Sequence, residues 1–377
     1  MHFNWNKRVL ASSFAVLSMA TSLYAIPKGP CDRQNDEICC ENPKPGPFAF
    51  AYPMDLGINC PRDFYVHIDG LAFQAKQDGM EFAIEDTATV GGIPTAPINY
   101  GDVIGFSNDN SDWDYNPGMR CGFGFFLDHD AWNIDFNWTW VNITDYKHGD
   151  ATTGGSILIP LWELGAGSGT TSAAFGPHSS AVWKAHYNTL DLSLGKPYHV
   201  SRYVIFNPHF GLRAGWIDQH FSVDYGANQN PANRVVHHGK NNFWGVGARA
   251  GLDTDWIVGK GWCLFANMSA SMMASKFEIH QNMIIPAGTQ AGDGYDLEND
   301  FYQNVPNMEL AIGIAWSKYF DRNKYRIGLR AAYEFIEWWD QLNMRRFSSG
   351  ASSYANDTVS RGNLTLNGFS LKLQLDI

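Results

Sequence analysis

The sequence predicts an all-β protein: a transmembrane antiparallel β-barrel of about ten strands, with short periplasmic turns and long extracellular loops. Three observations predict it. Apolar and polar residues alternate along many segments, and the connections between successive segments are alternately short and long. The composition combines 14% aromatic residues and 37 glycines with only 17% charged residues. Mean hydropathy is −0.27, as expected where half of each strand faces water.

The alternation is clearest from Trp132 to Trp140, which reads Trp-Asn-Ile-Asp-Phe-Asn-Trp-Thr-Trp. Side chains alternate across a strand, so five large apolar residues share one face and four polar residues share the other. A half-buried strand of a soluble sheet would give the same pattern. Tryptophan at both ends of the apolar face favours a membrane strand, because aromatic residues gather at the two membrane interfaces.

Residues 1–25 are expected to be a secretory signal. Lys7 and Arg8 precede a mostly apolar stretch, and Leu23-Tyr24-Ala25 is an acceptable cleavage site. Cleavage would remove two basic and no acidic residues, so the formal net charge of −11 would become more negative. An acidic chain argues against a nucleic-acid partner.

Residues 26–62 are rich in cysteine and proline and are expected to lie in the periplasm or in the barrel mouth. An exported chain meets an oxidising compartment, so disulfides are expected, within this segment or with another chain. The cysteines concerned are Cys31, Cys39, Cys40 and Cys60. Zinc is a weaker alternative, because no histidine lies among them and their spacing matches no common zinc finger. We therefore assign no metal site.

Ten segments with the alternation are expected to be the strands of a barrel over residues 63–377. They are residues 64–75, 115–127, 132–140, 182–195, 203–219, 243–256, 262–276, 308–317, 325–335 and 369–377. An even strand number places both ends of the barrel on the periplasmic side. Residues 80–85 either extend the first strand or add another, so twelve strands or more is the alternative.

Each of the first five strands has its own version of the pattern. Aromatic and aliphatic residues occupy every second position from Phe64 to Ile68, from Met119 to Phe125 and from Trp132 to Trp140. In the fourth strand, leucines at 190, 192 and 194 alternate with Thr, Asp and Ser. The fifth strand alternates in the same way, although Pro208 cannot donate a hydrogen bond to a neighbouring strand.

The last five strands repeat the pattern with different residues. From 244 to 252, Trp, Val, Ala and Leu alternate with Gly and Arg, and from 264 to 272, Leu, Ala and Met alternate mainly with Asn and Ser. Isoleucine and leucine alternate with Glu, Gly and Ser around 309–317, and tyrosine, isoleucine and leucine with Arg, Gly and Glu around 325–335. From Phe369 to Ile377, apolar residues alternate with Ser, Lys, Gln and Asp.

The connections between strands give an independent indication of topology. Short turns are expected at 128–131, 196–202, 257–261 and 320–324, and long loops at about 145–181, 220–242, 277–306 and 340–361. Outer-membrane barrels have short periplasmic turns and longer extracellular loops. The long loops are therefore expected outside the cell.

Polar residues on the inward faces are expected to line the pore. They are Arg120, Asp135, Asn137, Asp191, His209, Arg213, Arg249, Asp253, Glu309, Arg330, Glu334 and Lys372. The four arginines lie from mid-depth upward and three of the acids lie lower. They could form a basic constriction above an acidic exit, which would give a modest anion preference. They could equally pair across strands and hold the barrel in shape. Inward glycines could leave room for water, or only relieve packing.

Four segments combine glycine and aromatic residues in strand patterns: Trp132–Trp140, Trp183–Gly195, Asn207–Gln219 and Phe243–Leu252. In this order they resemble the Legionella/Parachlamydia-type major outer membrane protein family. The likeness lies mostly in the order of glycine and aromatic strand patterns and covers about residues 63–377. The resemblance implies an outer-membrane barrel regarded as a porin, with no catalytic residues. The chain departs from common barrel endings, because it closes with Ile377 and not with an aromatic residue.

The resulting hypothesis is an outer-membrane porin of a Gram-negative-type bacterium that lets small hydrophilic solutes and ions diffuse through. The alternative is a structural, disulfide-cross-linked or adhesive surface protein. Expected partners are outer-membrane lipid, small solutes and ions, further copies of the chain, or disulfide-linked envelope proteins. Enzymatic activity is not expected, because most of the 12 histidines lie singly in loops or turns. No cofactor is expected.

Overall fold

The computed structural model describes residues 52–53, 64–87, 89–90, 93–94, 100–106, 115–127, 132–151, 156–163, 176–226, 234–285, 292–349, 355–359 and 361–377. All of them belong to one compact unit, Lys44–Ile377. Among them, no helix is long and apolar enough to cross a membrane. The expected signal segment, residues 1–25, and the four N-terminal cysteines lie outside the described residues.

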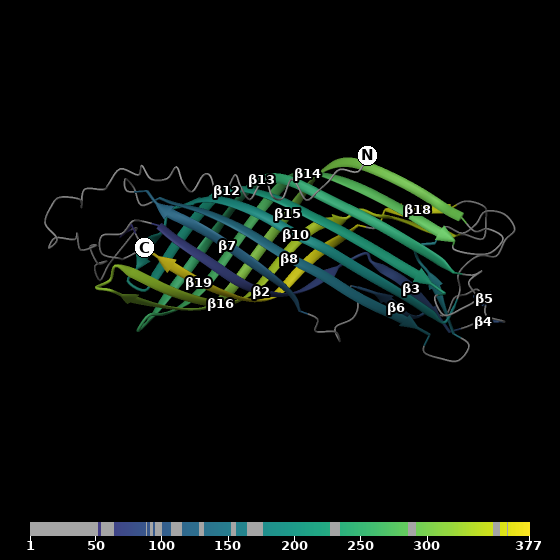
Figure 1. Ribbon diagram of the computed structural model, residues 1–377, viewed down its shortest axis with the longest axis horizontal. Helices are drawn as coiled ribbons and strands as arrows, with labels where there is room; N and C mark the ends of the chain where they lie inside the picture. Colours follow the sequence, from purple (N-terminus) through teal and green to yellow (C-terminus); the bar gives the residue numbers. More distant parts are fainter. Residues whose placement is uncertain are drawn as a thin grey trace. The chain divides into compact units, whose positions relative to one another are not determined.

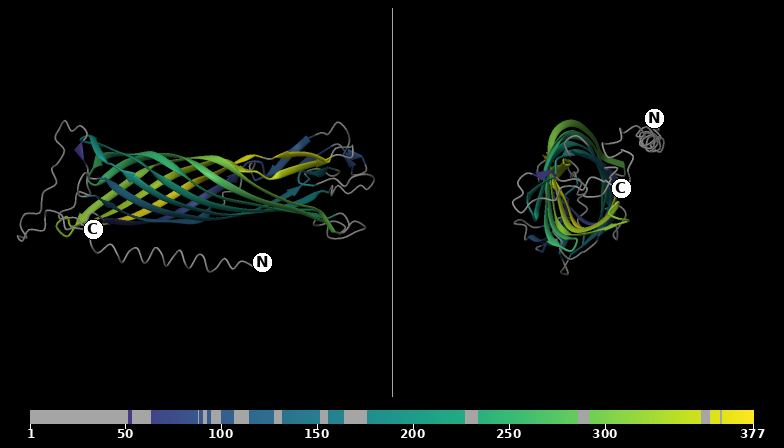
Figure 2. Two further views of the ribbon diagram at one scale, coloured as in Figure 1. Left: turned by 90° about the horizontal axis from the view of Figure 1, so that it is seen from above. Right: turned by 90° about the vertical axis from the view of Figure 1, so that its left-hand side faces the viewer.

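Ten long antiparallel strands close into a barrel, as the sequence predicts (Figures 1 and 2). They are β2 (Phe64–Gln77), β7 (Asn116–Phe126), β8 (Asn133–Asp150), β10 (His178–Gly195), β12 (Val204–Tyr225), β13 (Val235–Gly259), β14 (Trp262–Ile285), β15 (Gly292–Phe320), β16 (Tyr325–Leu342) and β19 (Gly362–Asp376). The first and last of them, β2 and β19, pair from Leu364↔Gln77 to Asp376↔Tyr65 and close the ring. The amide of Ile377 also donates a hydrogen bond to the Phe64 carbonyl at 2.9 Å.

Tight turns lie at the end of the barrel that holds the C-terminus. Gly259, Lys260 and Gly261 all have positive φ angles, of 121°, 53° and 83°. A Cβ atom at Gly261 would lie 2.4 Å from the Ser317 carbonyl oxygen, so this position requires glycine on two counts. The short strand β11 (Tyr198–Ser201) follows β10 at this end and pairs with β1 (Tyr52–Pro53). Residues 52–53 of the cysteine-rich segment therefore lie at the short-turn end.

Small sheets occupy the opposite end, as Figure 1 shows. Their strands are β3 (Glu81–Asp86), β6 (Tyr100–Gly105) and β9 (Ile157–Pro160) in one sheet, and the hairpins β4 (Thr89–Val90) with β5 (Ile93–Pro94) and β17 (Arg345–Ser349) with β18 (Ala355–Val359). Residues 81–86 thus neither extend the first strand nor add a strand to the barrel.

The strands are longer at this loop end than the sequence pattern predicts. The expected loops at 145–181, 220–242 and 277–306 are wrong in extent: β8 continues to Asp150, β13 begins at Val235, β14 continues to Ile285 and β15 begins at Gly292. The last strand also begins at Gly362 and not at 369. These extensions were missed because apolar residues change from one face of each strand to the other along its length.

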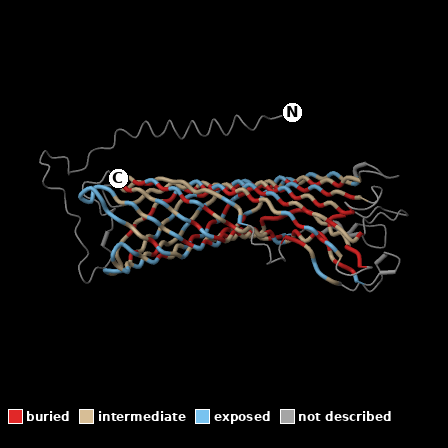
Figure 3. The backbone as a smooth tube through the Cα atoms, turned by 60° about the horizontal axis from the view of Figure 1, so that its bottom comes forward, coloured by how far each residue is buried: buried red, intermediate tan, exposed pale blue. Residues whose placement is uncertain are grey.

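Strand β10 shows this reversal. Near the short turns, Asp191 and Ser193 are buried inside the barrel and Leu192 is exposed on its outside. Farther along, Trp183 and Tyr187 are buried inside and Lys184 is exposed outside. The barrel therefore has a membrane half, with apolar residues outside, and an outer half, with apolar residues inside and water outside. Buried residues are most continuous in the half of the barrel farther from the C-terminus (Figure 3).

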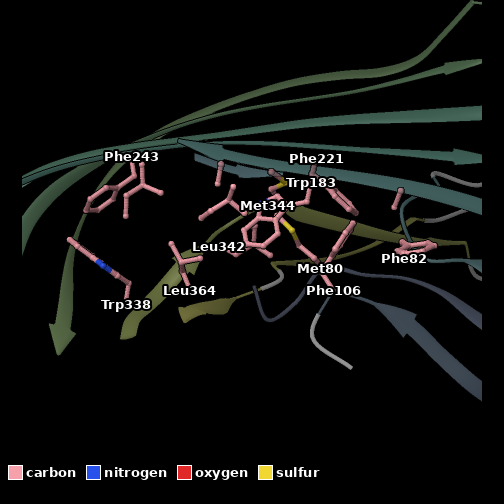
Figure 4. Close-up of a cluster of buried hydrophobic side chains, with 14 of the residues drawn as sticks. Met80, Phe82, Phe106, Trp183, Phe221, Phe243, Trp338, Leu342, Met344 and Leu364 are labelled. Carbon is pink, nitrogen blue, oxygen red and sulfur yellow. The ribbon is translucent and has the colours of Figure 1, made fainter. Parts of the chain in front are cut away.

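The lumen of the outer half is filled by a hydrophobic core (Figure 4). Strand residues such as Trp183 and Phe221 line it, and Met80, Phe82, Phe106 and Trp162 enter it from the segments around β3, β6 and β9. We call these four residues the core plug. The ring of Phe106 lies 6.0 Å from that of Trp183, and the ring of Trp162 lies 5.2 Å from that of Phe221.

One hydrogen bond joins the plug segments to the barrel wall, and a second joins two plug segments to each other. The Tyr225 hydroxyl donates to the Phe82 carbonyl at 2.6 Å, and the Trp162 indole N–H donates to the Glu81 carbonyl at 2.8 Å. Truncating a buried Phe or Trp to Ala costs about 3–5 kcal/mol, so the ring contacts of the core plug also stabilise the closed outer half.

Candidate functional site

A polar cavity of about 220 Å³ occupies the lumen of the membrane half. All twelve residues that the sequence predicts to line the lumen lie on its wall. Further polar residues on the wall are Asp69, Asn133, Thr139, Ser193, Asn207, Asn267, Ser269 and Ser370. The same alternation rule, applied to every polar inward position, identifies these additional residues.

Arg213 on β12 is the most deeply buried charge of the cavity wall, with 1% of its surface exposed. Its Nε and Nη2 donate to the two carboxylate oxygens of Asp191 at 2.6 and 2.7 Å, and its Nη1 lies 2.6 Å from Glu309 Oε1. The second oxygen of Glu309 accepts a hydrogen bond from Arg249 at 2.9 Å. Glu309 on β15 therefore bridges two arginines from β12 and β13. A buried charge needs such pairing, because it has lost its contact with water.

Arg120 on β7 forms a second group on the other side of the lumen. Its guanidinium donates to both oxygens of Glu334 at 3.0 and 2.8 Å, to Asp69 at 3.3 Å and to Thr139 Oγ1 at 3.1 Å. Asp69 is also 3.1 Å from the His67 ring nitrogen Nδ1. Arg120 and Glu334 belong to strands that are not neighbours in the sheet, so this pair spans part of the lumen.

A third group lies closer to the short turns. Arg330 pairs with Asp255 at 3.0 Å and lies over the Phe265 ring, 4.9 Å from its centroid. His209 Nδ1 is 3.6 Å from Asp253. Asp135 accepts hydrogen bonds from the Tyr65 hydroxyl, at 2.7 Å, and from the Asn137 amide.

The four inward arginines thus each have a carboxylate partner. The sequence allowed either an unpaired basic constriction or arginine–acid pairs across strands, and the geometry is that of the pairs. With six carboxylates and five Lys or Arg on the wall, the charge of the cavity is nearly balanced.

Two inward glycines make room for neighbouring side chains. A Cβ atom at Gly124 would lie 2.3 Å from the Tyr65 hydroxyl oxygen, and one at Gly251 would lie 2.5 Å from His209 Nε2. The sequence allowed inward glycines either to leave room for water or to relieve packing. At these two positions glycine relieves packing of the wall.

Several buried polar atoms of the wall have no hydrogen-bond partner among the described residues. They are His209 Nε2, Asn207 Oδ1, Asn267 Oδ1 and Arg249 Nε. An unpaired buried polar group is costly, so these atoms favour water or a small polar solute in the cavity.

Toward the loop end of the barrel, the hydrophobic core begins directly beyond the polar wall. On β10, Thr189 and Asp191 belong to the polar part, and Tyr187 and Trp183 already belong to the core. Cys121 and Cys263, the cysteines within the described residues, are free thiols. Cys263 faces inward and packs beside Phe265.

Comparisons with known proteins agree with an outer-membrane origin. The model of a family described as "Legionella pneumophila major outer membrane protein precursor" matches residues 59–377. No curated protein matches the chain.

Solved outer-membrane proteins are similar at low identity. The Escherichia coli outer membrane protease OmpT has 10% identity and a TM-score of 0.35, covering 84% of this chain and 96% of its own. A Pseudomonas aeruginosa FadL homologue has 8% identity and a TM-score of 0.24, covering 83% and 89%. The Pseudomonas putida toluene transporter TodX has 9% identity and a TM-score of 0.24, covering 84% and 91%.

Proposed function

Because this chain belongs to the Legionella pneumophila major outer membrane protein family, we propose that its outer-membrane barrel is a porin for small hydrophilic solutes and ions. The observation that carries the proposal is the polar cavity. A barrel wall that needed only to be stable could fill its lumen with apolar residues. The membrane half instead keeps twenty polar or charged wall residues around a cavity that favours water. We assign no enzymatic activity to the cavity.

Conduction on this proposal requires displacement of the core plug. The polar cavity and the outside of the cell are separated by the hydrophobic core, which includes Phe106 and Trp162. The plug residues lie in or next to the short strands β3, β6 and β9, which are outside the barrel sheet, so they can leave the lumen without breaking hydrogen bonds between the barrel strands. The porin is therefore expected to be mostly closed and to open rarely.

Single-channel conductance in a planar lipid bilayer tests this function. The double variant Phe106→Ala/Trp162→Ala should open at least tenfold more often than the wild type, because it removes ring contacts that hold the plug. Phe277→Ala is the matched control: it truncates a fully buried ring of the barrel wall and leaves the plug intact. Correct folding of each variant is checked by circular dichroism and by migration of the unheated protein on gels.

The porin proposal fails if the folded wild type and the folded plug variant both carry no current. The second candidate is then a structural or adhesive surface protein, which the closed core of the outer half favours. In that case non-reducing gels of intact envelopes should show multimers that dithiothreitol dissolves. Monomers alone would remove the cross-linking role assigned to Cys31, Cys39, Cys40 and Cys60.

A further inference from the structure

A row of aromatic residues marks the outer edge of the membrane half on the outside of the barrel. Trp216 on β12 pairs directly with Trp244 on β13, and Trp140 on β8 and Tyr302 on β15 continue the same row of cross-strand partners. All four are exposed on the outer surface. Tryptophan and tyrosine gather where the membrane meets water, so this row marks the interface on the loop side.

Basic residues lie just beyond this row. Lys184 on β10 is the direct cross-strand partner of His220 on β12, and His220 is the partner of Lys240 on β13. Direct partners have Cβ atoms about 5 Å apart, so the three side chains form one cluster. His220 and Lys240 each lie four residues beyond a tryptophan, which is about 13 Å along a strand. We call Lys184, His220 and Lys240 the basic cluster.

The basic cluster has no carboxylate among the direct cross-strand partners of its three residues. Neither of its lysines forms an ion pair with another described residue, whereas nearby Lys276 pairs with Glu278 and Asp300. The titratable groups next to the cluster are His186 on β10, its cross-strand partner Asp218 on β12, and His238 on β13. His280 on β14 is the other cross-strand partner of Lys240; it lies 2.7 Å from Asp296 and opposite Glu298. The pKa of His220 is lowered, first by burial and then by Lys240, His186 and Lys184. Two lysines held on either side of His220 favour an anion between them.

An apolar surface continues from the basic cluster into the membrane half. On the same strands, Leu192, Leu212 and Val246 are exposed on the outside of the barrel. The surface therefore offers a cationic site at headgroup level and an apolar strip below it. Free phosphate would use only the first, and a phosphorylated lipid would use both.

We propose that the basic cluster is a binding site for the phosphate groups of a phosphorylated glycolipid in the outer leaflet, whose acyl chains lie along β10, β12 and β13. This site is on the outside of the barrel and does not depend on whether the lumen conducts. Lysine is a phosphate ligand that acts as a point charge, and clusters of such residues beside a membrane recognise anionic headgroups. The glycolipid would anchor the outer half of the barrel at a fixed depth.

Binding of detergent-solubilised, bisphosphorylated lipid A to the full-length refolded protein tests the proposal. The double variant Lys184→Gln/Lys240→Gln should bind roughly 10- to 30-fold more weakly than the wild type. Each lysine near an anionic surface raises the affinity by about fivefold, and the variant lacks two. Lys260→Gln/Lys318→Gln is the matched control: it removes the same charge from exposed lysines at the short-turn end. Lipid A without its phosphates should bind the wild type as weakly as the bisphosphorylated lipid binds the first variant.

Other outcomes overturn the proposal. Equal weakening by the two double variants would mean that only net charge matters. Equal binding of the two forms of lipid A would show that the phosphates are not recognised. Full competition by millimolar inorganic phosphate, with no contribution from the acyl chains, would make the cluster a phosphate site and not a lipid site.

Discussion

Arg213 on β12 and Glu309 on β15 lie 2.6 Å apart inside the barrel, although neither of their strands neighbours the other in the sheet. The same carboxylate also pairs with Arg249 at 2.9 Å. One glutamate therefore joins distant parts of the wall across the lumen. Its loss would leave the buried Arg213 and the half-buried Arg249 with fewer partners.

Glu309→Gln should lower the free energy of unfolding by about 3–5 kcal/mol, because breaking a buried ion pair leaves an uncompensated charge. Urea unfolding followed by tryptophan fluorescence measures this change. Glu298→Gln, on the exposed outer wall, is the control and should change stability by less than about 0.5 kcal/mol. A similar small effect of both substitutions would show that the bridging carboxylate does not stabilise the barrel.

Phe210→Arg should hinder insertion into lipid vesicles, by about 2–4 kcal/mol near the membrane midplane, because it places a charge on the lipid-facing wall. Phe210 is 56% exposed on the outside of the barrel. Asn137→Arg is the control, since Asn137 lines the polar cavity. Vesicle titration with folded protein measures the difference, and an equal response to both substitutions would contradict the assignment of the two faces.

His237 should make the stability of the outer half depend on pH. Its ring is buried in the hydrophobic core against Trp162 and shares a hydrogen bond with the Tyr295 hydroxyl at 2.8 Å. Burial, with a smaller contribution from His238, lowers its pKa from 6.5 to about 3. The folded protein thus holds this ring neutral at pH values where the unfolded chain binds a proton. The stabilising contribution is complete above pH 6.5 and is lost as the pH falls from 6.5 toward 3.

Thermal unfolding between pH 7 and pH 4 measures this contribution. The wild type should lose up to about 1.4 kcal/mol per pH unit more than His237→Phe, which cannot be protonated. His238→Gln, which changes the adjacent exposed histidine, should keep most of the wild-type slope. Identical slopes for the wild type and His237→Phe would mean that His237 can be protonated without loss of packing.

His220 should strengthen binding of the phosphorylated glycolipid as the pH falls. The neighbouring Lys240, His186 and Lys184 add to burial in lowering its pKa, so the ring gains its positive charge only below its ordinary pKa. Affinity for bisphosphorylated lipid A should therefore rise several-fold from pH 7.5 to pH 5. His220→Gln should flatten this rise, because the other titratable groups around the cluster, which are His186, Asp218, His238 and His280, remain in both proteins. An unchanged pH profile in the variant would exclude His220 from the site.

The sequence by itself determined the number of barrel strands and the two faces of each membrane strand. Lipid excludes charged side chains, so a period of two separates Arg120 and Asp191 from Phe123 and Leu192 without knowledge of any neighbour. That is why the predicted lumen residues all lie on one cavity wall. Phe210 falls on the apolar face of the alternating fifth strand, and it is exposed on the outside of the barrel.

Only the tertiary structure decided which arginine meets which acid, how far each strand extends and what fills the outer half of the lumen. Arg120 and Glu334 are 214 residues apart in the chain, and the closure of the ring brings them together. The outer extensions of β13 and β15 were missed because beyond the membrane, water lies outside the barrel and the apolar residues turn inward. Alternation distinguishes two faces but not the environment that each face meets. That environment is set by the position of the membrane and by Phe106 and Trp162, which enter the lumen from other parts of the chain.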